Sequence, residues 1–125
     1  MRGRELIPVA QRLARVIDEP HVRSAVNRAY YAAYTELVHY AGRNGYVHSS
    51  GRGSHRRAWE FVGSLPDSDI SRRAERSAIR SQGLLLKQLR TKAGYQPFLR
   101  LAQADGGDAV RAAEGIVGAL DRLIP

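Results

Sequence analysis

The sequence contains no cysteine, which excludes disulfide bonds and thiolate metal sites. It also has no long apolar run: the N-terminal stretch MRGRELIPVAQRLARV lacks a signal-peptide core, and no window approaches a membrane span. Acidic residues are scarce, with 12 Asp and Glu against 20 Lys and Arg, so the formal net charge is +8. We therefore expect a soluble cytoplasmic protein, not associated with a membrane, whose partner is a polyanion or an acidic protein.

The positive charge is concentrated in two segments. No acid occurs between Glu36 and Glu60, where four arginines lie, and the range 72–92 holds seven basic residues beside the single acid Glu75. GC-rich coding can explain why arginine outnumbers lysine, but it explains neither the net sign nor the clustering. Such a distribution is typical of a protein that binds nucleic acid.

Apolar residues recur at helical spacing along the whole chain, and no segment alternates as a half-buried strand does. The pattern predicts helices over about 6–17, 20–41, 70–93 and 108–124, with a short helix beginning at residue 54. Connections are short and no repeat is present. We expect one all-α domain spanning 1–125, an antiparallel up-down bundle of four main helices and one short helix.

Three expectations concern helix ends. Ser54 is predicted to cap the short helix, and Asp67 or Asp69 the long helix that follows. The DGGD segment at 105–108 is predicted to precede the last helix. The core-facing stripe of the long helix should consist of Ile70, Ala74, Ala78, Leu85, Leu86, Leu89 and Ala93.

Two basic groups are candidates for holding phosphates. One surrounds the start of the short helix, where backbone N–H groups and the helix dipole favour an anion, and consists of Arg52, His55, Arg56 and Arg57. The other is a stripe at i, i+4 and i+8 on the long helix, formed by Arg72, Arg76 and Arg80. The alternative for both groups is a solvated helix surface. The histidines lack metal-ligand spacing with carboxylates, so no metal or cofactor is expected.

Three segments carry a resemblance when taken in order: SAVNRAYYAAYTELVHYAG (24–42), GSHRRAWEFV (53–62) and LLLKQLRTKAGYQP (84–97). Tyr30, Tyr31 and Tyr34 in the first are typical of a packed core or subunit interface, and base stacking is the alternative. The ordered set resembles HEPN domains, small helical bundles named for nucleotide binding in prokaryotes and higher eukaryotes. The resemblance covers residues 6–124.

The resemblance implies a two-fold dimer and, in many family members, a metal-independent ribonuclease that acts as a toxin or in antiviral defence. The catalytic motif of that family is an arginine followed four to six residues later by a histidine. RNGYVH matches it with Arg43 and His48. The match lies in the loop after the second helix, whereas the family motif lies near a later helix, where this chain has Arg90 without a following histidine.

Two functional hypotheses follow. The first is an RNA-binding, metal-independent endoribonuclease with Arg43 and His48 as the catalytic pair, working as a homodimer. The second is a non-catalytic HEPN module that binds nucleotide or scaffolds a nucleotidyltransferase partner. A DNA-binding protein is a weaker third hypothesis, because no recognition helix is visible.

Overall fold

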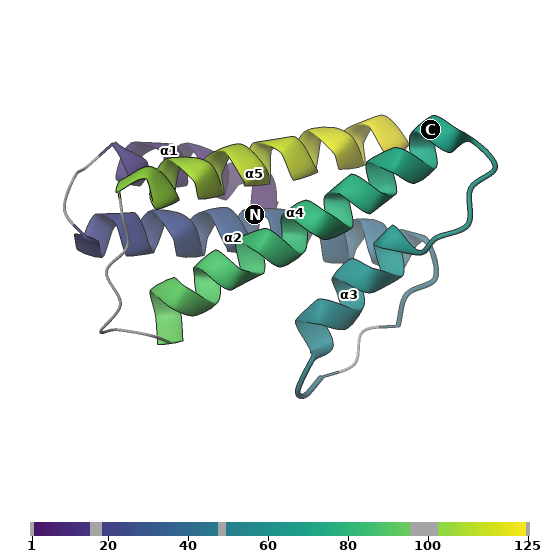
Figure 1. Cartoon of the computed structure of the whole chain (residues 1–125), viewed down its shortest axis with the longest axis horizontal. Helices are drawn as coiled ribbons and strands as arrows, with labels where there is room; N and C mark the ends of the chain where they lie inside the picture. Colours follow the sequence, from purple (N-terminus) through teal and green to yellow (C-terminus); the bar gives the residue numbers. More distant parts are fainter. Residues whose placement is uncertain (1, 16–18, 48–49, 96–102, 125) are drawn as a thin grey trace.

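The computed structural model describes residues 2–15, 19–47, 50–95 and 103–124, and these residues form helices without any strand. The all-α prediction is confirmed. Figure 1 shows the arrangement, and the helices are η1 (Gly3–Leu6, a 3₁₀-helix), α1 (Ile7–Ala14), α2 (Glu19–Arg43), α3 (Ser54–Gly63), α4 (Ile70–Tyr95) and α5 (Gln103–Leu123).

Helix α2 is central, and it packs against η1, α1, α3, α4 and α5. It runs antiparallel to α4: Arg23 near its start donates to the carbonyl of Ala93, while Tyr40 near its end accepts from Arg76. Helix α5 in turn runs antiparallel to α4 (Figure 1). Helices α1, α2, α4 and α5 therefore form an up-down bundle, and α3 is an additional short helix beside α4.

The packing of α2 depends on small residues between large ones. Ala25, Ala29, Ala32 and Ala33 are fully buried, which lets neighbouring helices approach the α2 backbone closely. Tyrosine and leucine side chains fill the remaining space. Because apolar and small residues occur on nearly every side of α2, this helix is buried almost all round.

A buried carboxylate fastens the N-terminal segment to α2. Glu36 is only 3% exposed and accepts hydrogen bonds from the guanidinium groups of Arg2 and Arg4, with Arg2 Nη2 at 2.7 Å. Arg4 also pairs with Asp121 on α5 at 2.8 Å. Burial tends to raise the pKa of Glu36, but hydrogen bonds and charge from the two arginines outweigh burial and lower it.

Helix α3 rests against α4 through a glycine. A Cβ atom at Gly83 would lie 2.1 Å from a ring carbon of the fully buried Trp59. No side chain other than hydrogen therefore fits at position 83 with α3 at its present distance. Gly115 on α5 is the opposite case, because a Cβ atom there would meet nothing within 4 Å.

The predicted helix ends are partly correct. Asp69 caps α4 by accepting from the backbone N–H of Ser71 at 2.8 Å, as predicted. Ser54 is not the cap of α3: the capping position is Gly53 in the left-handed region (φ 80°), and Ser54 is the first helical residue. The DGGD segment lies inside α5 instead of before it, since the helix begins at Gln103.

The predicted stripe of α4 is wrong at several positions. Leu86 and Ala93 are buried as expected, but Ile70 is 73% exposed and Leu85 is 51% exposed. Ile79, which the prediction left out, is buried instead. The reason is that α4 is covered by α2, α3 and α5 on different sides, so its buried positions do not follow a single stripe.

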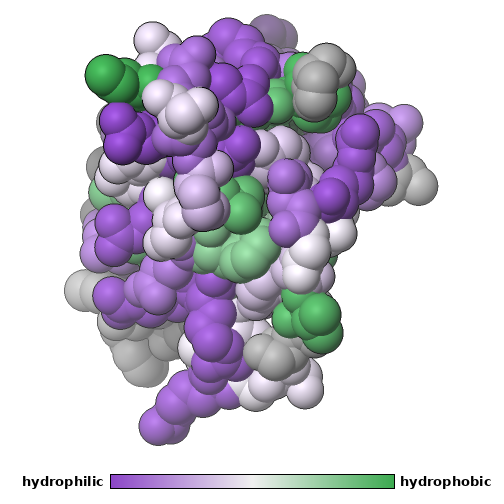
Figure 2. All heavy atoms as spheres, turned by 90° about the vertical axis from the view of Figure 1, so that its right-hand side faces the viewer, coloured by the Kyte–Doolittle hydropathy of each residue, from purple (hydrophilic) through white to green (hydrophobic). Residues whose placement is uncertain are grey.

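Figure 2 shows the molecule from the right-hand side of Figure 1. The exterior on this face is predominantly polar, and hydrophobic side chains appear only in small groups. Within the described ranges, none of the helices combines the length and the apolar composition needed to cross a bilayer.

Replacing Gly83 with Ala should destabilise the fold by roughly 1–3 kcal/mol, because the new methyl group overlaps Trp59. Gly115→Ala is the matched control: it gains helix propensity without a clash, so it should stabilise by about 0.5–1 kcal/mol. Urea unfolding followed by circular dichroism measures both. Equal effects of the two variants would contradict the described contact between α3 and α4.

Glu36→Gln should reduce stability at neutral pH and flatten its dependence on pH. The folded-state pKa of Glu36 is lowered, so its ion pairs stabilise the fold above the unfolded pKa, and this stability is lost as pH falls through the folded pKa. Urea midpoints from about pH 7 to about pH 3 should therefore show the gap between wild type and variant closing. Glu114→Gln, on the exposed side of α5, is the control. A gap that is constant over this range would refute the role of Glu36.

Candidate nucleic-acid interface

The start of α3 is built by glycines and lacks a side-chain cap. Gly51 and Gly53 both have positive φ values, 100° and 80°, which other residues rarely adopt. The capping residue Gly53 has no side chain that could accept from the first N–H groups of α3. A helix start of this kind presents backbone donors and a positive dipole end, with Arg52 just before it and Arg56 and Arg57 in its first turn.

His55, the second residue of α3, is packed against the tyrosines of α2. Its ring stacks on Tyr34 with centroids 4.0 Å apart and lies parallel to Tyr30 at 5.7 Å. The Nδ1 atom of His55 is 2.7 Å from the hydroxyl of Tyr30, which also accepts from Nε1 of Trp59 at 3.4 Å. The histidine is therefore held in a fixed orientation at the helix start.

The hydrogen bonds of Tyr30 also bear on the orientation of His55. Burial raises the pKa of Tyr30 to about 12, so the phenol keeps its proton at neutral pH. The indole of Trp59 can only donate, so the Tyr30 hydroxyl accepts from it, and the same hydroxyl has both a proton and a second lone pair for Nδ1 of His55. In either tautomer the Nδ1 atom of His55 is engaged by Tyr30.

Arg90 of α4 places a cation against the tyrosines of α2, one of which also bonds this histidine. Its Nη2 atom donates to the hydroxyl of Tyr31 at 2.7 Å, and its guanidinium lies over the rings of Tyr30 and Tyr31, 5.4 and 5.2 Å from their centroids. Contacts of this kind hold a guanidinium in one place without neutralising its charge.

A basic pocket of about 400 Å³ lies between α3 and α4. None of the described residues that line it is acidic; they are Arg56, Leu84, Lys87, Gln88, Thr91 and Lys92. Arg56 pairs with Glu60 on the exposed surface of α3, and Lys92 lies 3.8 Å from Asp105. The pocket combines three cations with two neutral hydrogen-bonding side chains, which suits a phosphate group.

The first predicted group of phosphate ligands is brought together. Arg52, Arg56 and Arg57 are exposed and surround the start of α3, next to the partly buried His55. Arg57 Nη1 donates to the carbonyl of Arg52 at 2.9 Å, which ties the helix to the preceding turn. These residues are therefore neighbours in space, and phosphate binding by them stays a prediction.

The predicted stripe of Arg72, Arg76 and Arg80 requires a correction. Arg76 is 5% exposed, donates to the hydroxyl of Tyr40 at 2.6 Å and lies 3.6 Å from Asp67. Arg72 pairs with Asp67 at 2.8 Å. Arg80 is exposed, but the stem of its side chain packs against Gly63. The stripe is not a continuous surface, because its middle member is inside the protein.

The predicted catalytic pair is only half described. Arg43 is the exposed last residue of α2, while His48 lies outside the described residues. Downstream of Arg43, the backbone N–H groups of Asn44 and Tyr46 both donate to the carbonyl of Ala41, which ends the helix in a tight turn. The distance between the two members of the pair therefore stays untested.

Sequence reasoning missed Arg90, Lys87 and the network around Tyr30 as parts of this surface. Tyr30 and Tyr34 are four residues apart and therefore share one face of α2, which is the signal for a common partner. Gly83, in the middle of a long helix, signals that another element approaches closely there. Neither signal identifies His55 as the partner, since that contact joins residues far apart in the chain.

Compared with known protein families, curated proteins and solved structures, the chain matches none of them. Its function has to be argued from this surface and from the sequence motifs. In the part of the chain that the structure describes, no cluster of three or more His, Asp or Glu side chains is placed to hold a metal ion.

The hydroxyl of Tyr30 should matter for the site and that of Tyr34 should not. Tyr30→Phe leaves the indole N–H of Trp59 and Nδ1 of His55 without their shared partner, so it should destabilise by about 1–3 kcal/mol. It should also remove the hydrogen bond at Nδ1 of His55, which ¹⁵N chemical shifts of the imidazole report. In Tyr34 the hydroxyl is buried without a hydrogen-bond partner among the described residues. Tyr34→Phe should therefore change stability little, and equal losses in both variants would contradict the network.

Proposed function

We propose that this chain binds RNA with the surface formed by the start of α3 and the adjoining basic pocket. The observation that supports this most is the gathering of cations at the start of α3 and in the adjoining pocket: Arg52, Arg56 and Arg57 at the first, and Lys87 and Lys92 with Arg56 in the second. Such cations bind the phosphates of a nucleic-acid backbone.

We further propose that the chain is a HEPN-type protein that forms a homodimer. The support comes from the resemblance in sequence and from one structural fact. The residues that carry the resemblance lie on α2, α3 and α4, and they contact one another: Tyr30 with His55 and Trp59, and Arg90 with Tyr30 and Tyr31. Motifs that meet in space are more specific than motifs that merely occur in order.

The proposed activity is metal-independent cleavage of RNA with Arg43 and His48 as the catalytic pair. In such a reaction the ribose 2′-oxygen attacks the adjacent phosphorus, one group removes the 2′ proton, and another protonates the departing 5′-oxygen. Histidine performs either proton transfer near neutral pH, and arginine stabilises the charge on the phosphate in the transition state. His55 and the arginines around it would hold the neighbouring phosphates.

A second candidate is a non-catalytic HEPN module that binds nucleotide or scaffolds a nucleotidyltransferase. The engagement of His55 favours it, because its Nδ1 atom is bonded to the Tyr30 hydroxyl at 2.7 Å and its ring is stacked on Tyr34, so the side chain is held by the fold. If no other histidine acts, the surface binds phosphates without cleaving them. The basic face would then contact the partner protein or its nucleotide.

One experiment with two readouts tests these proposals. Binding to a labelled single-stranded RNA is measured over a range of salt concentrations, and cleavage of total RNA is followed in EDTA. Arg56→Gln with Lys87→Gln should weaken binding and reduce its salt slope by about 0.7 for each lost phosphate contact. Arg12→Gln, an exposed arginine on α1, is the control. An unaltered salt slope would contradict the assignment of the RNA-binding surface to the start of α3 and the adjoining pocket.

In the cleavage readout, His48→Ala and Arg43→Ala should abolish activity while leaving RNA binding nearly intact. His55→Ala should weaken binding. If wild type leaves RNA intact at every enzyme concentration but still binds it, the non-catalytic candidate replaces the ribonuclease. Cleavage that survives His48→Ala would show that another residue is the catalytic base.

A further inference from the structure

The three clustered tyrosines of α2 differ sharply in their exposure to solvent. Tyr30 is fully buried and Tyr34 is 9% exposed, so packing inside the fold accounts for both rings. Tyr31 is 42% exposed, and it is the aromatic one among the exposed large hydrophobic side chains of the described residues. The structure therefore leaves Tyr31 as the tyrosine of this cluster whose ring is open to a ligand.

Two contacts hold the ring of Tyr31 in one orientation. It meets the buried ring of Tyr30 at a centroid distance of 5.9 Å and an interplanar angle of 76°. Its hydroxyl accepts a hydrogen bond from Nη2 of Arg90 at 2.7 Å, and the Arg90 guanidinium lies 5.2 Å from the ring centroid. A side chain that is already fixed loses little rotamer freedom when a ligand binds to it. Tyr31 and Arg90 together form an ordered aromatic platform with a cation beside it.

The aromatic platform adjoins the basic pocket between α3 and α4. Arg90 directly precedes Thr91 and follows Lys87 by three residues, and both of these residues line the pocket. Side chains three residues apart on a helix are neighbours, with about 5–6 Å between their Cβ atoms. A ring for a base and cations for a phosphate are thus within one helical turn of each other on α4. This combination is typical of sites that bind single-stranded nucleic acid.

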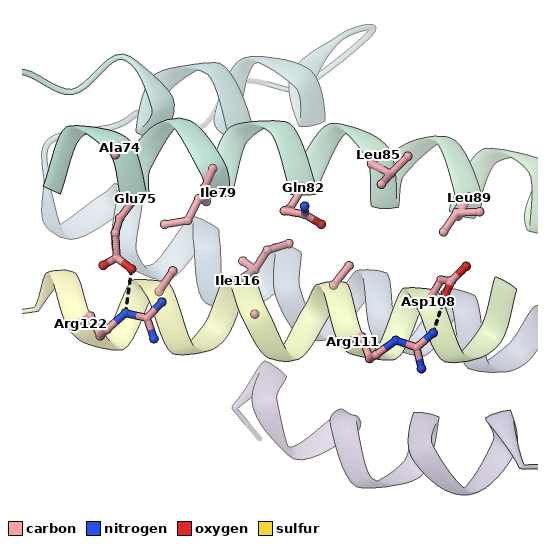
Figure 3. A pocket seen from close by; sticks show the side chains of 14 residues that line it. Ala74, Glu75, Ile79, Gln82, Leu85, Leu89, Asp108, Arg111, Ile116 and Arg122 are labelled. Atoms are coloured by element: carbon pink, nitrogen blue, oxygen red, sulfur yellow. Dashed lines mark hydrogen bonds and ion pairs between the residues drawn. The ribbon is translucent and has the colours of Figure 1, made fainter. Parts of the chain in front are cut away.

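A larger groove, of about 760 Å³, lies between α4 and α5 and has a different character (Figure 3). The described residues that line it include no aromatic ring, and its exposed large apolar side chain is Leu85. Its two guanidinium groups are paired with carboxylates of the same groove, Arg122 with Glu75 at 2.7 Å and Arg111 with Asp108. This groove therefore offers neither a stacking surface nor an excess of positive charge.

We propose that an unpaired base of a single-stranded RNA stacks on Tyr31 and that the strand continues into the basic pocket. This inference rests on the proposed RNA-binding function and names its substrate class. Stacking on a side chain requires an open base face, which an unpaired base has and a base inside an A-form duplex lacks. Every base has such a face, so the contact tolerates different sequences. The aromatic platform therefore selects single strands without selecting a sequence.

The first test separates the ring of Tyr31 from its hydroxyl. Tyr31→Phe and Tyr31→Leu both lose the hydrogen bond to Arg90, but only Tyr31→Phe keeps a flat aromatic ring. Tyr31→Leu should weaken the binding of a labelled single-stranded RNA by about 5-fold to 100-fold, whereas Tyr31→Phe should bind nearly as well as wild type. Leu85→Ala, which removes an exposed apolar side chain from the groove of Figure 3, is the control and should bind like wild type.

The second test varies the RNA instead of the protein. The probes are the same single strand, a strand of ribose phosphates that lacks the bases, and a blunt duplex. Wild type should prefer the strand with bases to the strand without them, and Tyr31→Leu should lose that preference by the same factor by which it loses affinity. The affinity of Tyr31→Leu for the duplex should equal that of wild type. A purely structural role of Tyr31 would lower the affinity for all three probes alike.

Salt dependence separates this inference from the RNA-binding proposal itself. Stacking involves no phosphate, so Tyr31→Leu should lower the affinity without changing the salt slope, whereas Arg56→Gln with Lys87→Gln should reduce the slope. If Tyr31→Leu binds like wild type while the slope still falls in the Arg56 and Lys87 variant, the aromatic platform is refuted and the RNA surface stands. Equal losses in Tyr31→Phe and Tyr31→Leu would also overturn the stacking contact. A wild type that binds no RNA would refute both proposals.

Discussion

The burial of α2 is the constraint on which the rest of the structure depends. This helix packs against every other helix of the described chain, yet it carries Glu36 and several tyrosine hydroxyl groups into the interior. A buried polar group without a partner is costly, so neighbouring elements have to supply donors and acceptors. They do so with Arg2 and Arg4 for Glu36, and with Trp59 and His55 for Tyr30. The positions of the N-terminal segment and of α3 follow from this requirement.

The arginine side chains consequently fall into two groups, those bonded within the fold and those exposed on the surface. Some guanidinium groups are structural: Arg76 bonds a tyrosine inside the protein, and Arg23 donates to the carbonyls of Lys92 and Ala93 near the end of α4. Others, such as Arg52 and Arg56, are exposed around the start of α3. A net charge of +8 therefore overstates the charge available to a ligand, and only part of the exposed remainder lies on α3 and α4.

The helices could be predicted from the sequence because their apolar spacing is a local property. The all-α class, the approximate bounds of α2 and α4 and the cap at Asp69 followed from it. Burial of individual residues on α4 could not be predicted, since Leu85 and Ile79 are distinguished only by which helix covers them. The glycines of DGGD were mistaken for a helix boundary, although α5 begins at Gln103 and a Cβ atom at Gly106 would meet Ala14 and Val22 only at the ordinary contact distance of 3.6 Å.

The candidate site was predictable only where its residues are neighbours in the sequence. The basic residues at the start of α3 are neighbours in sequence, and their grouping was therefore visible. The contact of His55 with Tyr30 and the position of Arg90 join three helices, and single-sequence spacing contains no information about them. Arg76 shows the opposite error: its spacing matched a surface stripe, while its environment is decided by Tyr40 and Asp67.

The contact between Gly83 and Trp59 links packing to chemistry. The ring that touches the glycine also donates the hydrogen bond to Tyr30, and at 3.4 Å that bond is already long. Trp59 and His55 both belong to α3, so a movement of α3 would displace both partners of the Tyr30 hydroxyl together. A residue without a side chain thus sets how close α3 lies to α4, and with it the position of both α3 side chains that bond the Tyr30 hydroxyl.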